Sequence, residues 1–213
     1  MDCKINLLVT SIVEITNKRR LVYINYEPAF ALYNTEIRKY GIKQDSSIDC
    51  EVYKDIIEDV LNKRATVRAM SLLKNKDYTE KELTDKLKAG YYPEESINTA
   101  LDYVKSFKYV DDYRYAYNYI SFKSGVKSRK YIELKLKEKG IASEIISGVC
   151  EEYYSDNVNV ELDQVLEFLK NRCSIDAVSD YKERQKIMAK LYRKGYSIDI
   201  INKALDIVVD DSY

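Results

Sequence analysis

The charged side chains of this 213-residue chain could bind an anion, but its composition offers little for catalysis. The sequence contains no histidine, which removes the usual general base, the serine and cysteine nucleophile systems that depend on it, and the commonest metal ligand. It has six glycines and no glycine-rich phosphate loop. We therefore expect no enzymatic activity, no cofactor and no metal site.

The four cysteines lie far apart in the sequence. None of them forms the Cys-x-x-Cys pair that is typical of zinc sites and dithiol redox sites. We interpret them as reduced and partly buried thiols. They are Cys3, Cys50, Cys150 and Cys173.

A net charge of zero conceals a segmental pattern. Residues 113–141 hold eight basic and two acidic side chains, residues 142–183 three and ten, and residues 184–195 five and none. This alternation predicts distinct basic and acidic faces. A cationic surface could meet DNA phosphates or an acidic protein surface, and its binding would depend on salt. The candidate binding residues are Lys123, Lys127, Arg129, Lys130, Lys135, Lys137, Lys139, Lys190, Arg193 and Lys194.

Simpler interpretations stay open for these residues. A lysine-rich segment can be a solvated helix face, and we expect the acidic segment 142–183 to be a solvated outer face. The 21 tyrosines could stack on unpaired bases. We expect most of them, such as Tyr103, Tyr117 and Tyr131, to fill small helical cores instead.

The basic segments belong to a repeated element. Three stretches that begin at Lys86, Lys135 and Lys190 align without a gap, 49 and 55 residues apart. Each stretch predicts a helix that ends on a basic turn, followed by a second helix, and a recurrence at this period marks a repeated supersecondary unit. The first copy has Tyr91 where the other two have glycine, so we expect its turn to be shifted by one residue.

Each copy is part of a predicted module of three helices. Pro93 suits the first position of a helix, and Ser143 and Ser197 suit N-caps. Asp111 and Asp112 could suggest a metal or acid pair, but capping of a helix N-terminus explains them better. The helices expected in the last module lie near 159–172, 180–194 and 198–209.

Residues 7–33 differ from the rest because they are rich in β-branched and aromatic types. They predict a hairpin, with a third short strand over 30–33. A helix over about 34–40 and another that runs on into the first repeat follow. The predicted fold is mainly α, with tandem three-helix repeats after a small N-terminal β-hairpin and helix domain. The predicted domains are 1–62, 63–110, 111–157 and 158–213.

The chain shows no sign of membrane insertion or export. No apolar run approaches the ~20 residues of a membrane span. The N-terminus has no signal-peptide pattern. We expect a cytoplasmic monomer.

Four motifs follow one another along the chain: Tyr40 to Ile42 after the hairpin, Tyr78 to Leu83, Tyr109 to Ala116 with Tyr119, Ile120 and Lys123, and Leu136 to Ile141. Taken in this order, they resemble the RecX family, bacterial regulators of the recombinase RecA. The resemblance covers nearly the whole chain and rests on the order and spacing of its motifs. Two departures are Lys76, where the family usually has arginine, and Ser128, where it often has glycine.

The resemblance implies an elongated, curved array of three-helix repeats that lies in the groove of the RecA filament on single-stranded DNA. It implies inhibition of RecA's ATP hydrolysis, strand exchange and stimulated cleavage of the LexA repressor, with a role in recombinational repair and the SOS response. The charge pattern places the binding surface on the second and third modules. The alternative is a stand-alone DNA-binding module that acts without RecA, although a pI near 6.4 argues mildly against it.

Overall fold

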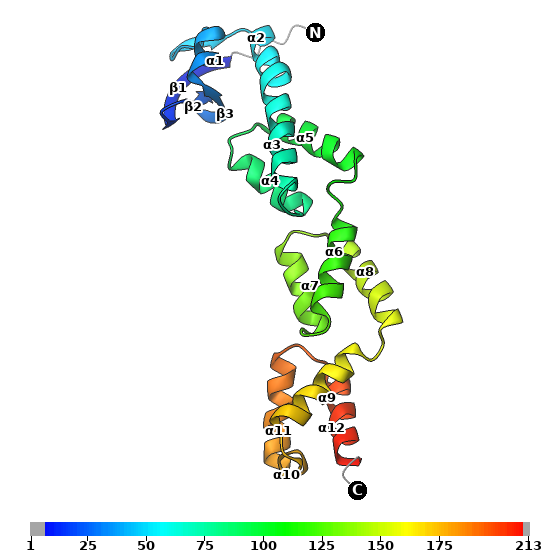
Figure 1. Cartoon of the computed structure of the whole chain (residues 1–213). Helices are drawn as coiled ribbons and strands as arrows, with labels where there is room; N and C mark the ends of the chain where they lie inside the picture. Colours follow the sequence, from blue (N-terminus) through cyan, green and yellow to red (C-terminus); the bar gives the residue numbers. More distant parts are fainter. Residues whose placement is uncertain (1–6, 211–213) are drawn as a thin grey trace. The chain divides into compact units, whose positions relative to one another are not determined.

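The chain divides into two compact units, with the boundary between Asp111 and Asp112. The computed structural model describes residues 7–210, apart from the side chains of residues 175 and 176. Unit 1 holds a small sheet and the first three-helix bundle, and the described part of unit 2 is helical (Figure 1). The predicted fold class, mainly helical with a small N-terminal sheet, is confirmed.

The N-terminal sheet is antiparallel, with strand order β3-β2-β1-β4. The predicted hairpin is confirmed, with Ile12 opposite Val22. The third strand begins at Glu27 and includes Pro28, which an edge strand tolerates because one side of it needs no hydrogen bonds. The short fourth strand was not predicted, since three residues are too few to show an alternating pattern. The strands are β1 (Leu7–Thr16), β2 (Arg19–Ile24), β3 (Glu27–Tyr33) and β4 (Ser46–Ile48).

A continuous helical segment joins the sheet to the first three-helix bundle. Its first half buries Ile56 and Leu61 in the core of the sheet, beside Phe30. Its second half buries Ala65 and Ala69 in the core of the bundle. The predicted run of this helix into the first repeat is therefore confirmed. The segment consists of α2 (Cys50–Asp55), a π-helical stretch η1 (Ile56–Asn62) and α3 (Lys63–Leu73), and it follows the short helix α1 (Asn34–Lys39).

The first bundle packs α3 against α4 (Glu80–Lys88) and α5 (Glu94–Ser106). Leu83 and Leu87 are fully buried between these helices. A capping box starts α4: the Glu82 amide donates to Thr79 Oγ1 at 3.1 Å, and the Thr79 amide donates to Glu82 Oε2 at 3.3 Å. The box satisfies two amides at the helix start.

Unit 2 contains two further helical bundles, each with its own buried core. The last bundle has an unpredicted fourth helix, α10, which spans only five residues. The helices of the second bundle are α6 (Asp112–Lys123), α7 (Arg129–Glu138) and α8 (Ser143–Asp156). Those of the third are α9 (Val160–Arg172), α10 (Ile175–Ser179), α11 (Tyr181–Arg193) and α12 (Ile198–Asp210).

The recurring turn has the same backbone in all three bundles. Tyr91, Gly140 and Gly195 have φ values of 59°, 81° and 95°, in the left-handed region. The next amide in each copy donates to the carbonyl of the buried leucine five residues earlier, and the left-handed residue itself donates three residues back. This is the Schellman arrangement that ends many helices. The expected one-residue shift in the first copy is wrong, because Tyr91 adopts the conformation that glycine usually supplies.

Two predicted helix starts differ from the structure. Helix α8 begins at Ser143 itself, and Ala142 precedes it without a side-chain cap. Pro93 occupies the N-cap position of α5 rather than its first turn. At α12 the expectation is supported, since the Ile200 amide donates to Ser197 Oγ at 3.3 Å. A capping-type residue in the sequence thus predicts the start of a helix only to within one position.

The cysteines differ in burial. Cys150 is buried, Cys173 is half-buried and Cys50 is exposed, so the expectation of partly buried thiols is wrong for Cys50. Cys3 lies outside the described residues. Between residues 7 and 210, no helix is long and apolar enough to cross a membrane.

Candidate nucleic-acid and partner interface

The ten predicted binding residues lie on or beside two helices of unit 2. Seven of them belong to the end of α6, the following loop and α7, and three belong to α11 and the turn after it. Lys123, Arg129, Lys135 and Lys139 are half-buried, and the other six are exposed. The structure divides them into two groups, each interleaved with aromatic rings, and leaves four residues apart.

The first group is a tyrosine–lysine cluster on the second bundle. Residues four apart share a helix face, which aligns Tyr131 and Lys135 on α7, and Lys127 lies in the loop just before that helix. The ammonium groups of Lys127 and Lys135 lie 5.0 and 5.8 Å from the centroid of the Tyr131 ring. That of Lys139 lies 5.3 Å from the ring of Tyr115. The cluster comprises Tyr115, Tyr119, Tyr131, Lys127, Lys135 and Lys139.

Burial and local charge act on this cluster in opposite ways. Burial raises the pKa of the Tyr119 hydroxyl, while Lys139 and Lys135 lower it. A hydrogen bond from Lys135 Nζ to Glu138 Oε2, 2.6 Å long, raises the pKa of Lys135. Lys135 therefore stays charged at neutral pH.

The second and third bundles meet through a polar contact next to the basic residues. Ser128 Oγ accepts from the Tyr131 amide at 3.4 Å and donates to the Lys194 carbonyl at 2.7 Å. A Cβ at Gly195 would lie 2.6 Å from Ser128 Oγ, so the close approach requires glycine. The Arg129 amide donates to Glu161 Oε1 at 2.8 Å.

Gln164 strengthens the same contact. Its side-chain amide donates to the Ser124 carbonyl, and its Oε1 accepts from the Tyr196 hydroxyl at 2.8 Å. Burial raises the pKa of Glu161, and the hydrogen bond from the Arg129 amide opposes that shift. Because these partners come from both bundles, the contact fixes the N-terminus of α7 against the turn after α11.

This contact assembles the second group, a junction cluster. Lys130 Nζ lies 6.0 Å from the centroid of the Tyr192 ring. Lys190 and Lys194 lie 5.3 and 4.6 Å from the ring of Phe168. Lysines separated by about 60 residues in the sequence are thereby held on one junction. The junction cluster comprises Lys130, Lys190, Lys194, Phe168 and Tyr192.

The remaining four predicted residues do not join these clusters. Arg129 Nε donates to Glu133 Oε1 at 2.8 Å, and its guanidinium lies against the Tyr154 ring, so its charge is largely satisfied within the fold. Lys123 lies over its neighbour Phe122. Arg193 Nε donates to the Ala189 carbonyl, and Lys137 is exposed on α7.

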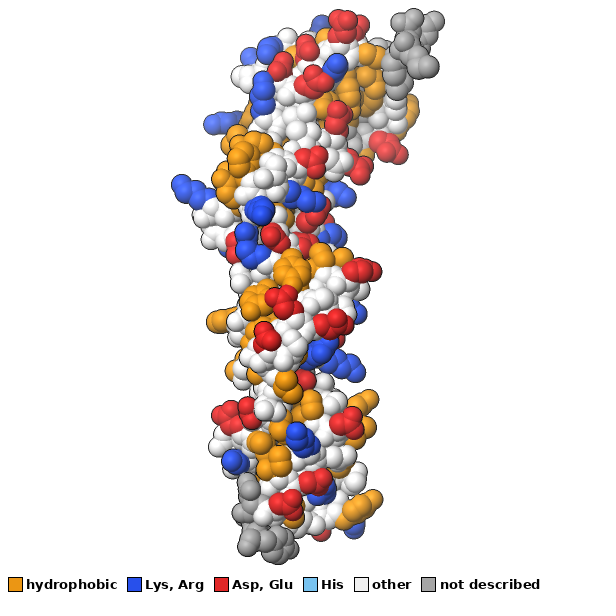
Figure 2. All heavy atoms as spheres, turned by 90° about the vertical axis from the view of Figure 1, so that its right-hand side faces the viewer, with side chains coloured by type: hydrophobic (Ala, Val, Ile, Leu, Met, Phe, Trp, Pro, Cys, Tyr) orange, Lys and Arg blue, Asp and Glu red, His pale blue; other side chains and the backbone are white. Residues whose placement is uncertain are grey.

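Sequence reasoning missed the aromatic partners of the lysines. Tyr103, Tyr117 and Tyr131 are 45%, 39% and 37% exposed, so the expectation that they fill helical cores is wrong. Figure 2 shows hydrophobic side chains at the surface among charged ones. The spacing of Tyr131 and Lys135 was a usable signal, since residues four apart lie on one helix face.

A second set of cations, in unit 1, was missed as well. Arg19, Arg64, Arg68 and Lys86 line one pocket, although they come from a strand and two helices. Arg19 stands in a basic run, Lys18 to Arg20, and residues 63–76 around Arg64 and Arg68 hold five basic and no acidic side chains. These segments lie far apart in the sequence, so the charge pattern did not indicate a common site.

Two models of the RecX family match the chain. The model of the first three-helix domain of RecX matches residues 65–103, and that of the third matches residues 159–205. Among curated proteins, the regulatory protein RecX of Caldanaerobacter subterraneus subsp. tengcongensis is 33% identical over 204 residues, which cover 94% of this chain and 100% of that protein. The regulatory protein RecX of Clostridium botulinum strain Alaska E43 is 31% identical over 195 residues, covering 89% and 90%.

Two solved structures share the fold. A crystal structure of a regulatory protein RecX superposes with a TM-score of 0.59 at 19% identity, over 94% of this chain and 99% of that one. RecX from Lactobacillus salivarius superposes with a TM-score of 0.62 at 23% identity, over 69% and 96%. Together with the sequence matches, these structures account for the tandem three-helix bundles.

Proposed function

This chain belongs to the RecX family of regulatory proteins, and we propose that it binds the RecA filament on single-stranded DNA and inhibits RecA. The activities inhibited are ATP hydrolysis, strand exchange and the stimulated cleavage of LexA. The protein acts by binding in the filament groove, without catalysis of its own, as a monomer in the cytoplasm. Its effect is to modulate recombinational repair and the SOS response. Family membership and the names of the relatives support this role.

The observation that carries the proposal is the pairing of exposed and half-buried lysines with aromatic rings in unit 2. The tyrosine–lysine cluster and the junction cluster each place two or more ammonium groups within 6.0 Å of aromatic ring centroids. Lysines neutralise phosphates, and exposed rings stack on unpaired bases. A surface with both features suits single-stranded DNA held inside a protein filament.

The direct test is the ATPase activity of RecA on single-stranded DNA, titrated with this protein. We expect wild-type protein to abolish the activity near stoichiometry. Charge reversal of the junction cluster removes three cations, and we expect it to raise the concentration for half-inhibition by about tenfold and to lower the salt dependence of binding. The variant carries Lys130→Glu, Lys190→Glu and Lys194→Glu.

A matched control changes the charge equally on exposed lysines outside both clusters. We expect this control to inhibit like wild type. Unchanged RecA activity at stoichiometric wild-type protein would sink the proposal, whereas equal inhibition by both variants would remove only the site. The control carries Lys43→Glu, Lys54→Glu and Lys203→Glu.

A stand-alone DNA-binding module is the alternative, and the same lysine–aromatic pairing favours it because it needs no RecA to meet DNA. The discriminating measurement is fluorescence anisotropy with labelled single-stranded and duplex DNA in the absence of RecA. A sequence preference, or affinity for naked DNA that equals affinity for the filament, would favour the alternative.

A further inference from the structure

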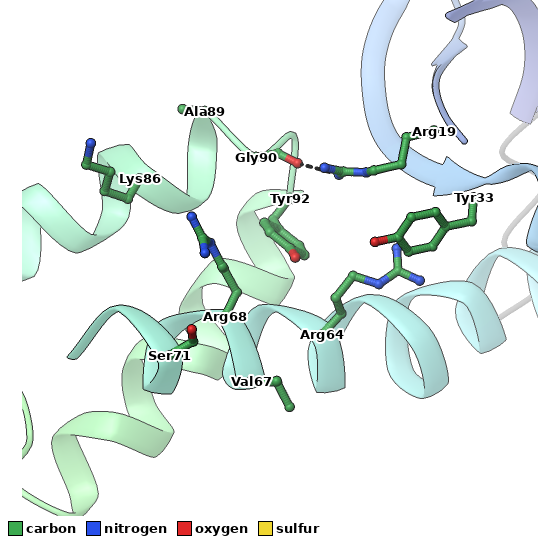
Figure 3. A pocket seen from close by; sticks show the side chains of 10 residues that line it. All are labelled: Arg19, Tyr33, Arg64, Val67, Arg68, Ser71, Lys86, Ala89, Gly90 and Tyr92. Atoms are coloured by element: carbon green, nitrogen blue, oxygen red, sulfur yellow. Dashed lines mark hydrogen bonds between the residues drawn. The ribbon is translucent and has the colours of Figure 1, made fainter. Parts of the chain in front are cut away.

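A polar pocket of about 610 Å³ lies between the N-terminal sheet and the first three-helix bundle, within unit 1 (Figure 3). Strands β2 and β3, helices α3 and α4, and the turn after α4 form its walls. Its lining contains four basic side chains and no acidic one. The basic residues are Arg19, Arg64, Arg68 and Lys86.

We propose that this pocket binds the phosphate groups of a single-stranded nucleic acid. The site lies in unit 1 and uses none of the lysines of the unit 2 clusters, and it requires no RecA. It therefore does not depend on the proposed function.

Two of the four cations are available to a ligand. Arg68 and Lys86 are exposed, and their side chains form no hydrogen bond or ion pair within residues 7–210. Figure 3 shows the Arg68 guanidinium between Lys86 and Tyr92. A guanidinium binds phosphate bidentately, and an ammonium adds a compact point charge.

The other two cations form the base of the pocket and are partly satisfied by the fold. Arg19 Nη2 donates to the Gly90 carbonyl at 2.9 Å, and Arg64 forms an ion pair with Glu36. Both guanidinium groups lie near the ring of Tyr33, at 5.9 and 4.7 Å. These contacts order the two side chains before a ligand arrives, which lowers the entropy that binding must overcome.

Each of these two arginines nevertheless has an unmet donor. Arg19 Nε and Arg64 Nη1 are buried and have no hydrogen-bond partner in the described part of the chain. A buried donor without an acceptor is unfavourable, because it has lost its hydrogen bonds to water and gained none in the fold. A phosphate group in the pocket would bring acceptor oxygens to the two guanidinium groups that carry these donors.

Tyr92 shows that the positive charges converge. Burial raises the pKa of its hydroxyl, and Arg64, Arg19 and Arg68 each lower it through their charge. Three guanidinium groups therefore act on the same half-buried side chain. Glu36, which pairs with Arg64, is an acidic neighbour of the pocket. One carboxylate beside four cations leaves the pocket with an excess of positive charge.

The shape and lining favour a nucleic-acid strand over a free phosphate ion or an acidic peptide. The pocket is as large as typical small-molecule sites and exceeds the needs of one phosphate. Tyr33 and Tyr92 line it beside the cations, and such rings provide faces for a base or sugar. An acidic peptide would use the cations but has no aromatic base to stack on these rings.

The test is the binding of labelled oligothymidine to the full chain without RecA. The lysines of the tyrosine–lysine cluster and of the junction cluster are first reversed, so that residual binding reports on unit 1. On that background we expect Arg68→Glu with Lys86→Glu to weaken binding by about tenfold. The salt slope should fall by about 1.4, since each of the two phosphates that is no longer neutralised reduces it by ~0.7. The milder pair Arg68→Gln and Lys86→Gln should act in the same direction with less risk to folding.

The control pair Lys43→Glu and Lys54→Glu changes the charge of unit 1 equally and should leave affinity unchanged. Competition identifies the ligand: unlabelled oligothymidine should displace the probe, and inorganic phosphate or ATP at equal phosphate concentration should not. Equal affinity of the pocket variants and the control pair overturns the site. Displacement by ATP or by a poly-glutamate peptide as effective as by oligothymidine overturns the assignment to a nucleic-acid strand.

Discussion

The turn after α4 and the turn after α11 share one backbone but contact different neighbours. In unit 1 the carbonyls of Gly90 and Tyr91 accept from Arg19 Nη2 at 2.9 Å and from the Ala31 amide at 3.3 Å, so the turn binds the sheet. In unit 2 the Lys194 carbonyl accepts from Ser128 Oγ at 2.7 Å, so the turn binds the neighbouring bundle.

This difference explains why one copy tolerates a tyrosine and the other has glycine. The sheet meets the first turn through outward-facing carbonyls, which leaves room for the exposed side chain of Tyr91 at the left-handed position. The second bundle meets the third turn at the left-handed residue itself, where a Cβ on Gly195 would lie 2.6 Å from Ser128 Oγ. The copies of the repeat thus share the backbone conformation of the turn, and the residues that contact the turn differ from copy to copy.

The largest effect is expected when the third turn is given a side chain. Gly195→Ala adds a Cβ at φ 95° and forces Ser128 Oγ away from the Lys194 carbonyl. The left-handed strain and the overpacking together should destabilise unit 2 by about 2–4 kcal/mol. Urea unfolding, with hydrogen exchange to assign the loss to residues 112–210, measures this.

Gly41→Ala separates the backbone strain from the clash. Gly41 has φ 63°, and a Cβ there meets nothing within 4 Å, so only about 1 kcal/mol should be lost. Adding Ser128→Gly to Gly195→Ala should recover the part due to the clash. If Gly195→Ala costs no more than Gly41→Ala, the close approach of the two bundles does not constrain the turn.

A smaller effect of opposite sign is expected at the first turn. Tyr91→Gly relieves the strain of a non-glycine residue at φ 59° and removes an exposed side chain. Because glycine also increases the entropy of the unfolded chain, the net gain should be about 0.5–1 kcal/mol. A higher urea midpoint for unit 1 is the readout. A loss of stability would show that the Tyr91 ring, rather than the backbone carbonyls, holds the sheet.

The repeat and the elements it contains could be predicted from sequence because they rest on local signals. The Leu87, Leu136 and Leu191 positions recur with their helices, and helical spacing around them indicates buried faces. Tyr91 was misinterpreted because glycine preference is only statistical, and the hydrogen bonds around the turn hold a tyrosine in the same conformation. The strand β4 and helix α10 were missed because segments of three and five residues carry no period.

The site could be predicted only where its charges cluster in sequence. The basic segments around α7 and α11 identified Lys130, Lys190 and Lys194, although their assembly depends on the contact of Ser128 with the turn after α11. The cations of the unit 1 pocket come from separate segments of the sequence, and Arg19 and Lys86 are brought together only by the packing of β2 beside the turn that follows α4. Long-range packing of this kind has no local pattern.

The smallest expected effect is on the pH dependence of stability, and it concerns one carboxylate in each unit. In unit 1, a hydrogen bond from Lys63 lowers the pKa of Asp59 below its ordinary 3.8. Its contribution to stability is therefore complete above pH 3.8 and is lost as the pH falls through the lowered pKa. In unit 2, burial raises the pKa of Glu161 above its ordinary 4.5, so its favourable contribution is complete below pH 4.5 and is lost as the pH rises through the raised pKa.

The stability of Asp59→Asn and that of Glu161→Gln, each measured relative to wild type, should therefore change in opposite directions as the pH rises. Relative to wild type, Glu161→Gln should gain stability in unit 2 as the pH rises above 4.5. Asp59→Asn should lose stability in unit 1 as the pH rises towards 3.8. Urea midpoints across these two windows provide the measurement. Parallel pH profiles for Glu161→Gln and wild type would mean that the hydrogen bond from the Arg129 amide offsets the effect of burial on Glu161. The contact between the second and third bundles would then include no cost for burying a charge.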